Sequence, residues 1–485
     1  MLFNSISFFI LLIFTFFVYW FVLKKSIKLQ NVFLLVISYF FYGAWDWRFL
    51  FLLFFSSILD FTIGIALSNS TKRKKILLGI SLFSNLGLLV YFKYMNFFIS
   101  SFTELMNTLN ISTNTSSLNI ILPVGISFYT FQTLSYTIDV YKGKIKASRD
   151  PISFLAFVSF FPQLVAGPIE RATHLLPQFL KKRTFNYHLA VLGCRQIIWG
   201  LFKKVVIADN CAEYANLIFN NYQEYNGIIL FIGAVFFAFQ IYGDFSGYSD
   251  IAIGVSRLFG FSLMQNFAFP YFSRDISEFW RRWHISLSTW FRDYIYIPLG
   301  GSRVSKIKLI RNTFVIFMVS GLWHGANWTF LVWGMLHTLF ILPIIIFKQN
   351  RKNLTIVAEN SLLPSLKDFI KICFTFSLVT FAWIFFRADS IQQALEICCK
   401  IPLSVSYIMN YHETFNFILC NVKSSILIIL LLFIIIEWIG RKGEFALEKM
   451  FLHKKSFLNL FIYSILLLLV IQLSGKEQNF IYFQF

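Results

Sequence analysis

The sequence predicts an all-α protein that crosses a membrane many times. Of its 485 residues, 57% are hydrophobic and 14% are charged, and the mean hydropathy is +0.66. A soluble globular domain carries about 25% charged residues. Apolar runs of about twenty residues, the length at which a helix spans a bilayer, recur along the whole chain. Together these observations indicate an integral membrane protein built from helices.

Twelve apolar runs are candidates for membrane-spanning helices. They lie at 5–23, 31–45, 49–67, 76–93, 118–140, 188–207, 226–243, 309–326, 329–347, 366–386, 423–439 and 457–474. Short basic clusters separate many of them, at 24–28, 72–75, 142–149, 181–183, 303–311, 348–352 and 441–455. Such clusters mark cytoplasmic loops, so we expect the N-terminus to lie outside the cytoplasm. These loops account for the net charge of +20, and we expect a lipid bilayer as partner and no nucleic acid.

Two segments are predicted to interrupt the helices. The apolar run 151–167 has basic residues on both flanks and contains Pro162 and Gly167. Proline breaks a helix, and irregular backbone inside a membrane has to be surrounded by protein or by a water-filled cavity. The polar stretch 243–250, which has two glycines, is predicted to form a second break that lines a cavity open to the cytoplasm. Its candidate binding residues are Asp244, Ser246, Tyr248 and Asp250.

Two histidines are the candidate reaction centre. His324 lies in the motif 320–328, at the end of the apolar run 314–319, and His284 lies in the basic, amphipathic stretch 281–286. An ionisable side chain inside a membrane protein is a candidate for function, and histidine can move protons near neutral pH. Two structural alternatives stay open. His324 can be a packing residue bonded to a neighbouring helix, and His284 can reach water from a helix lying on the membrane surface.

The stretch 278–303 is rich in arginine and aromatic residues. Three of its arginines are candidates to bind a phosphorylated cofactor at the cytoplasmic side: Arg281, Arg282 and Arg292. The neighbours of the two histidines, Trp283, Trp323 and Asn327, complete the candidate binding residues. Gly321 and Gly325 flank His324 and allow close approach of a substrate or of another helix. No metal site and no tightly bound cofactor are expected.

Six ordered motifs resemble one known family. They lie at 122–132, 161–171, 243–252, 280–303, 320–328 and 480–485. With these motifs the chain resembles the membrane-bound O-acyltransferase family, and within it the bacterial polysaccharide branch. Most of the motifs fall within 120–340, and we expect residues 1–485 to form a single membrane domain of this family.

The resemblance implies a fold and an activity. The family fold is a ring of tilted helices, here roughly 11 to 12 spans with re-entrant segments, around a central funnel. His324 takes the catalytic position and His284 the second active-site position. The implied donor is acetyl-CoA, with acetyl passed across the bacterial inner membrane for O-acetylation of an alginate-like polysaccharide or of peptidoglycan. An esterase-like protein on the outer face is the implied partner.

Several alternatives remain open from the sequence. D-alanyl transfer to teichoic acid is the nearest within the family, and acetylation of His324 itself is an alternative to base catalysis. A secondary transporter has broken helices too, but it usually shows two related halves, and none are detected here. A scaffold for polysaccharide export would need no histidines within the membrane.

Overall fold

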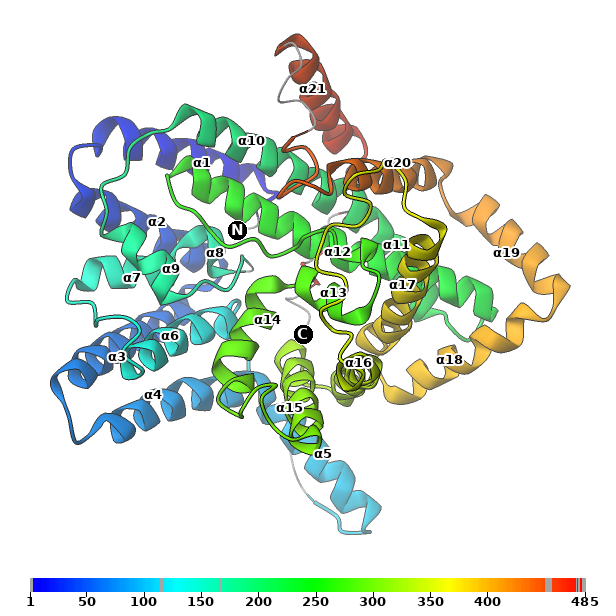
Figure 1. Ribbon diagram of the computed structural model, residues 1–485, viewed down its shortest axis with the longest axis horizontal. Coiled ribbons are helices and arrows are strands. Elements are labelled where there is room, and N and C mark those ends of the chain that lie inside the picture. Colours follow the sequence, from blue (N-terminus) through cyan, green and yellow to red (C-terminus); the bar gives the residue numbers. More distant parts are fainter. Residues whose placement is uncertain are drawn as a thin grey trace. The chain divides into compact units, whose positions relative to one another are not determined.

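The computed structural model describes residues 3–113, 117–165, 167–449, 456–476, 478 and 480–481. All regular structure in these residues is helical, which confirms the predicted fold class. Two compact units are present: Met1–Val191 with Val255–Met264, and Leu192–Gly254 with Gln265–Phe485 (Figure 1). Parts of the predicted basic cluster 441–455 and of the terminal motif 480–485 lie outside the described residues. The prediction of a single membrane domain is not tested by this division and stays a prediction.

The first unit is made mainly of the N-terminal helices. Its helices are α1 (Ile6–Phe17), η1 (Val18–Val22), α2 (Ile27–Asp46), η2 (Trp47–Phe49), α3 (Leu50–Asn69), α4 (Lys74–Leu89), η3 (Val90–Tyr94), α5 (Met95–Thr108), α6 (Ile126–Tyr141), α7 (Pro151–Ser159), α8 (Phe161–Leu164) and α9 (Ala172–Phe179). Side-chain caps start several of them; Asp150 accepts from the backbone of Ile152, with Pro151 at the first helical position of α7.

The second unit carries the candidate site. Its helices are α10 (Tyr187–Leu201), η4 (Phe202–Ala208), α11 (Asp209–Asn220), α12 (Gly227–Leu258), η5 (Pro270–Phe272), α13 (Ile276–Arg282), α14 (Ile285–Phe291), η6 (Arg292–Tyr296), α15 (Lys306–His324), α16 (Trp328–Ile346), α17 (Leu366–Arg387), α18 (Ile391–Val405), α19 (Ile408–Asn421), α20 (Ser424–Gly440) and α21 (Ser456–Gln472). The first residues of α10 and the last of α12 belong to the first unit.

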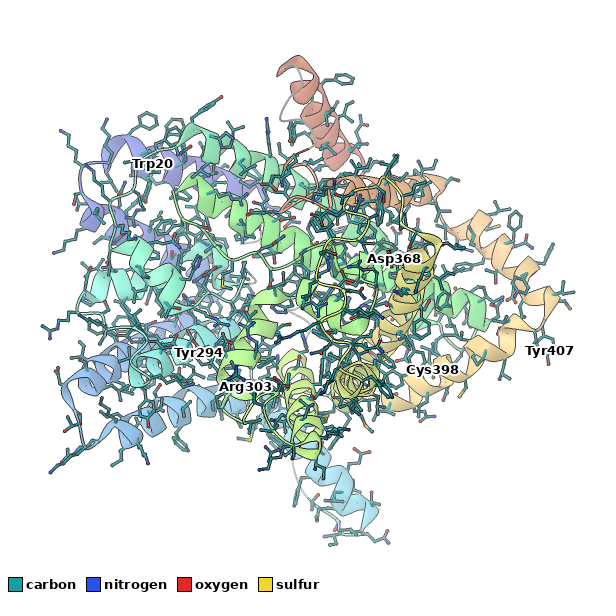
Figure 2. All side chains as sticks on the ribbon, viewed as in Figure 1. Trp20, Tyr294, Arg303, Asp368, Cys398 and Tyr407 are labelled. Carbon is teal, nitrogen blue, oxygen red and sulfur yellow. The ribbon has the colours of Figure 1, made fainter. Side chains whose placement is uncertain are left out.

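Several helices are able to cross a membrane, and the protein is a multi-pass membrane protein. Among the described residues, five helical stretches are long and apolar enough: Ile27–Asn69, Lys74–Thr108, Gly227–Leu258, Trp328–Ile346 and Leu366–Arg387. The bent pair α19 and α20 makes a sixth if it counts as one span. Large apolar side chains are exposed on many helices, as lipid contact requires; Tyr407, between α18 and α19, is 65% exposed (Figure 2).

The predicted interruption at 151–167 is confirmed. Helix α7 ends at Ser159, Phe160 leaves the helical conformation with ψ of 106°, and the four-residue α8 follows. The segment is buried within the first unit, with Phe154, Phe157 and Phe160 each 0% exposed. Its irregular backbone is therefore surrounded by protein, as a membrane requires.

The predicted interruption at 243–250 is wrong, because α12 runs through it without a break. The glycines serve close helix packing instead. A Cβ on Gly247 would lie 2.7 Å from the carbonyl oxygen of Gly200, and a Cβ on Gly243 would lie 2.9 Å from that of Lys203. The two carboxylates, Asp244 and Asp250, pair with two buried lysines of η4, a stretch of π-helix next to α10.

Candidate active site

His284 lies where the aromatic, arginine-rich stretch breaks into two short helices. Helix α13 ends at Arg282, and α14 begins at Ile285. His284 between them has the left-handed dihedrals φ 43° and ψ 54°, which are rare for a residue with a Cβ. The side chain is 0% exposed, so His284 does not reach water from a surface helix. Trp283 beside it is equally buried.

Burial also determines the charge of His284. The residue lies outside the membrane-spanning stretches named above. Burial lowers its pKa well below the usual value of 6.5, because a charged imidazolium loses solvation there. The ring is therefore neutral at pH 7.

His324 is the last residue of α15 and is held by close packing of this helix against α16 (Figure 1). A side chain on Gly321 would collide with the backbone of Phe330, and one on Gly334 with the backbone of Phe317. The space beside Gly321 is therefore occupied by the neighbouring helix α16 and not by a substrate. The His324 side chain is 2% exposed, against the rings of Trp333 and Phe386 at 5.1 and 5.3 Å.

The two histidines lie side by side in an aromatic cage. Their ring centroids are 6.4 Å apart. Trp323 contacts both, at 5.6 Å from His284 and 5.0 Å from His324, and Phe245 of α12 packs edge-on against His284 at 4.6 Å. Residues forty positions apart in the chain thus form one buried pair, as proton transfer to a shared substrate requires.

A cavity of about 400 Å³ adjoins the cage at the beginning of α16. Phe330 and Phe386 belong to its wall. Two buried polar atoms in the wall, Oε1 of Gln240 and Oγ1 of Thr329, have no hydrogen-bond partner within the described residues. Arg387 contributes a cation to the same wall. Buried polar groups are normally satisfied, so the cavity suits a polar molecule that supplies hydrogen bonds.

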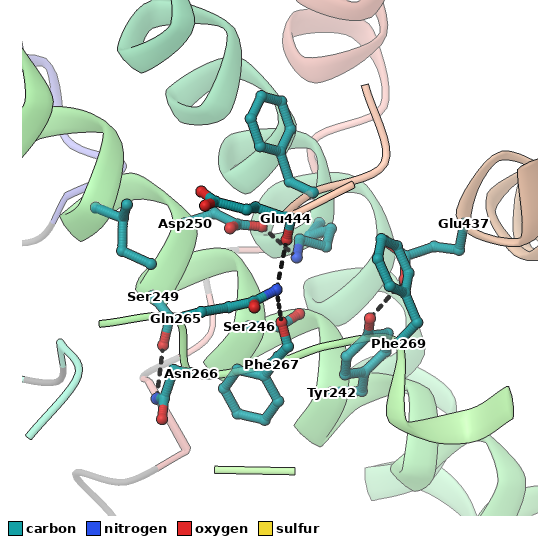
Figure 3. Close-up of a pocket in the computed structure, with 13 residues that line it drawn as sticks. Tyr242, Ser246, Ser249, Asp250, Gln265, Asn266, Phe267, Phe269, Glu437 and Glu444 are labelled. Carbon is teal, nitrogen blue, oxygen red and sulfur yellow. Dashed lines mark hydrogen bonds and ion pairs between the residues drawn. The ribbon is translucent and has the colours of Figure 1, made fainter. Parts of the chain in front are cut away.

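A second, much smaller polar space adjoins the cage through Asn266 (Figure 3). Its volume of about 10 Å³ is close to that of a single water probe. Lys203 pairs with Asp250 at 2.5 Å, and the Tyr242 hydroxyl donates to Glu437 at 2.5 Å.

Both spaces are lined by α12, the large cavity by Phe237 and Gln240 and the small one by Tyr242, Ser246 and Asp250. The large cavity is lined by the start of α16 and the end of α17, whereas the small one is lined by Glu437 at the end of α20. Arg441, just after α20, binds the carbonyls of Val357 and Ala358 in the loop that joins α16 to α17.

The three candidate arginines differ in their surroundings. Arg281 donates to the carbonyls of Asn350 and Asn353, at 2.8 and 2.7 Å, and Arg282 pairs with Glu278 at 2.8 Å. Both guanidinium groups thus hold protein segments together. The side chain of Arg292 is 58% exposed and pairs with its neighbour Asp293. Arg292 has the most room for a ligand.

The remaining candidate residues form two groups: some line the two spaces, and others hold the C-terminal segment in place. Asn327 caps α16 and lines the large cavity, whereas Ser246 lines the small space. Asp244 accepts from the backbone of Ile481, and the ring of Tyr248 packs against that of Phe480 at 4.8 Å, so these two hold the C-terminal segment. The last four residues of the terminal motif, 482–485, lie outside the described residues.

Sequence reasoning missed Asn266, which contacts His284 directly. Its side-chain Oδ1 lies 3.1 Å from Nδ1 of His284. Asn266 belongs to no motif and to no regular element, so only its position in space reveals it.

Comparison with known proteins agrees with this geometry. Residues 145–386 match the membrane-bound O-acyltransferase family. The chain is 41% identical over 374 residues to a Pseudomonas aeruginosa protein described as probable alginate O-acetylase AlgI, covering 76% of this chain and 68% of that protein. It is 35% identical to the peptidoglycan O-acetyltransferase of Helicobacter pylori, covering 77% of this chain and 74% of that protein. The teichoic acid D-alanyltransferase of Bacillus subtilis is 29% identical, covering 53% of this chain and 68% of that protein.

The buried histidine pair in a helical membrane protein and these similarities define the class. The chain belongs to the membrane-bound O-acyltransferase family, and it is an acyltransferase.

Proposed function

We propose that the protein takes an acetyl group from cytoplasmic acetyl-CoA and passes it to an acceptor at the outer face of the bacterial inner membrane. The transfer serves O-acetylation of an envelope or extracellular polysaccharide. The observation that supports this best is the buried pair of His284 and His324, 6.4 Å apart, with a cavity of about 400 Å³ adjoining it at the start of α16 and a small polar space adjoining it through Asn266. A transferase that works between two compartments needs access from both.

The chemistry is a direct transfer with His324 as general base. His324 removes the proton from an acceptor hydroxyl, the oxygen attacks the thioester carbonyl carbon, and the carbon–sulfur bond breaks. The thiolate then takes the proton back from His324, so no proton is gained or lost overall. The C-terminal end of α15 favours the transient positive charge on His324. General base catalysis of this kind contributes about 10²–10⁴-fold in rate.

Charge distribution supports the orientation. The basic residues Lys348, Arg351 and Lys352 follow α16, and such clusters favour the cytoplasmic side for that end of the helix. In the proposed orientation the cavity at the start of α16 is the outer one, and the N-terminus is proposed to lie outside. Gln240 and Thr329 in its wall suit a polar acceptor, either a sugar or a serine hydroxyl of an esterase-like partner protein.

Acetyl transfer is favoured over D-alanyl transfer by the degree of similarity. The relative with the acetylase description shares 41% identity over 76% of the chain, against 29% over 53% for the D-alanyltransferase. The same comparison supports only a class of acceptor, an envelope or extracellular polysaccharide. The acetylating relatives are described as acting on different polymers, alginate and peptidoglycan.

The test uses purified protein in lipid vesicles supplied with labelled acetyl-CoA. We expect slow release of free CoA without an acceptor and faster release when a hydroxyl acceptor is added on the opposite side of the vesicle. A vesicle preparation supplied with a D-alanyl thioester serves as the donor control. Absence of any thioester turnover would overturn the proposal and favour a transporter or a scaffold.

A further inference from the structure

Asn266 binds both the ring of His284 and the backbone beside it. The residue lies in the loop after α12 and is 1% exposed. Its Oδ1 lies 3.1 Å from Nδ1 of His284 and accepts from the Ser286 hydroxyl at 2.8 Å. Its Nδ2 donates to the hydroxyl of Ser249 at 3.0 Å.

A backbone donor determines which of the two positions in the Asn266 side-chain amide is the oxygen and which is the nitrogen. Oxygen and nitrogen of an amide are assigned from their hydrogen-bond partners, and hydroxyl partners can switch between donor and acceptor. The main-chain N–H of Ser286 can only donate, and it points at Oδ1 of Asn266 at 3.3 Å. The opposite orientation of the amide would set two donors against each other.

The orientation of the amide in turn determines the proton on His284. Because Oδ1 of Asn266 is an acceptor, Nδ1 of His284 has to carry the hydrogen. The ring is neutral, so its other nitrogen, Nε2, carries the lone pair. We infer that Asn266 is a positioning residue that holds His284 as the Nδ1–H tautomer and makes Nε2 a hydrogen-bond acceptor in the active site.

The same residue also stabilises the strained backbone of His284. A left-handed conformation at a residue with a Cβ is strained and persists only where its surroundings enforce it. The main-chain N–H of Ile285 donates to the carbonyl of Asn266 at 2.9 Å, and the N–H of Ser286 donates to its side chain. Asn266 therefore binds the two residues that directly follow His284.

This assignment limits what His284 does in the reaction. An acceptor at Nε2 is unable to donate to the negative oxygen that forms on the attacked carbonyl. It is suited instead to accept a hydrogen bond from the acceptor hydroxyl or from protonated His324, and so to orient one of them. This consequence rests on the proposed function, whereas the tautomer assignment does not.

Nitrogen-15 NMR of the full-length protein in lipid, labelled at histidine, tests the assignment directly. The His284 signals are identified by their loss in His284→Gln. We expect a neutral ring with its hydrogen on Nδ1 at pH 7. A hydrogen on Nε2, or a charged ring, would overturn the inference whatever the enzyme does.

Variants separate positioning from folding. Asn266→Asp keeps an acceptor facing Nδ1, so we expect it to keep the Nδ1–H, whereas Asn266→Ala should release the ring to a mixture of tautomers. Gln265→Ala is the matched control, because that neighbouring amide donates to the carbonyls of Phe267 and Glu444 instead. A pure Nδ1–H signal in folded Asn266→Ala would refute the role of Asn266. If that variant does not fold, a wild type or an Asn266→Asp protein that lacks the Nδ1–H would overturn the inference.

Enzyme activity is a second readout, independent of the NMR measurement of the tautomer. With thioester turnover as the assay, we expect Asn266→Ala to lower kcat by about 10–100-fold, as the loss of a residue that orients an active-site histidine does. The KM for acetyl-CoA should change little. A proportional fall in both tautomer purity and kcat supports the inference, whereas a wild-type kcat with mixed tautomers overturns its catalytic part. If the wild type turns over no thioester while its His284 keeps the Nδ1–H, the proposed function fails and the assignment stands.

Discussion

Removing Lys203 tests whether the polar residues of α12 stabilise the fold. The Lys203 and Asp250 side chains are 4% and 11% exposed, and their charged atoms are 2.5 Å apart. In Lys203→Met the Asp250 carboxylate stays buried without its cation. Breaking a buried pair in this way costs about 3–5 kcal/mol of unfolding free energy. Gln196 still donates to Asp250 at 2.8 Å, so we expect the lower part of that range.

The double variant Lys203→Met with Asp250→Asn is the decisive comparison. It removes both charges, and its amide keeps an oxygen for Gln196. Replacing both members of a buried pair is often close to neutral. We therefore expect the double variant to regain most of the stability that the single variant loses.

The assay is a denaturant titration in detergent micelles, followed by tryptophan fluorescence. A single variant as stable as the wild type would show that water reaches Asp250 and would refute the reasoning. A double variant no more stable than the single would refute it equally. Thioester turnover in the double variant then tests Asp250 as a substrate-binding residue, because a structural role leaves most of the activity intact.

Four further variants test the helix packing, the donor site and the large cavity. Gly247→Ala should destabilise the protein by about 1–3 kcal/mol, because its Cβ would lie 2.7 Å from the carbonyl oxygen of Gly200. Gly87→Ala, with open space around its Cβ, should stabilise by about 0.5–1 kcal/mol; equal effects in thermal melts would contradict the packing argument. Arg292→Ala should raise the KM for acetyl-CoA with kcat unchanged, and an unchanged KM would remove Arg292 from the donor site. Thr329→Val should raise the KM for the acceptor and leave acceptor-free thioester hydrolysis as it is; a change in hydrolysis instead would place Thr329 on the donor side.

The all-helical class was predictable because composition and run length report directly on the membrane. The break at 151–167 was predictable for a similar reason, since its prolines and its charged flanks are local features. The stretch 243–250 was misread because glycines with polar residues fit two structures. They mark a broken helix, or a continuous helix packed closely against another with buried ion pairs. The lysines that decide between them, Lys203 and Lys204, lie about forty residues earlier, where no local pattern connects them to α12.

The candidate site was predictable in its residues and not in its geometry. The two histidines stand out in sequence because ionisable groups in apolar surroundings are rare. The burial of His284 depends on the break between α13 and α14, and no proline or glycine in the sequence marks that break. Asn266 is an ordinary polar residue in a loop, and its role exists only through contacts with residues twenty positions away.

The central claim is that His324 is the catalytic base. The most direct test measures O-acetylation of the cell envelope with His324→Ala in place of the wild type, together with the amount of protein in the membrane. His337→Gln is the matched control, because His337 is also fully buried and also packs against Trp333, at 4.8 Å, but its Nδ1 accepts a hydrogen bond from Nε1 of Trp280, at 3.2 Å. We expect His324→Ala to reach the membrane normally and to lose about 10²–10⁴-fold in activity, while the control keeps most of its activity. Full O-acetylation by His324→Ala would contradict it.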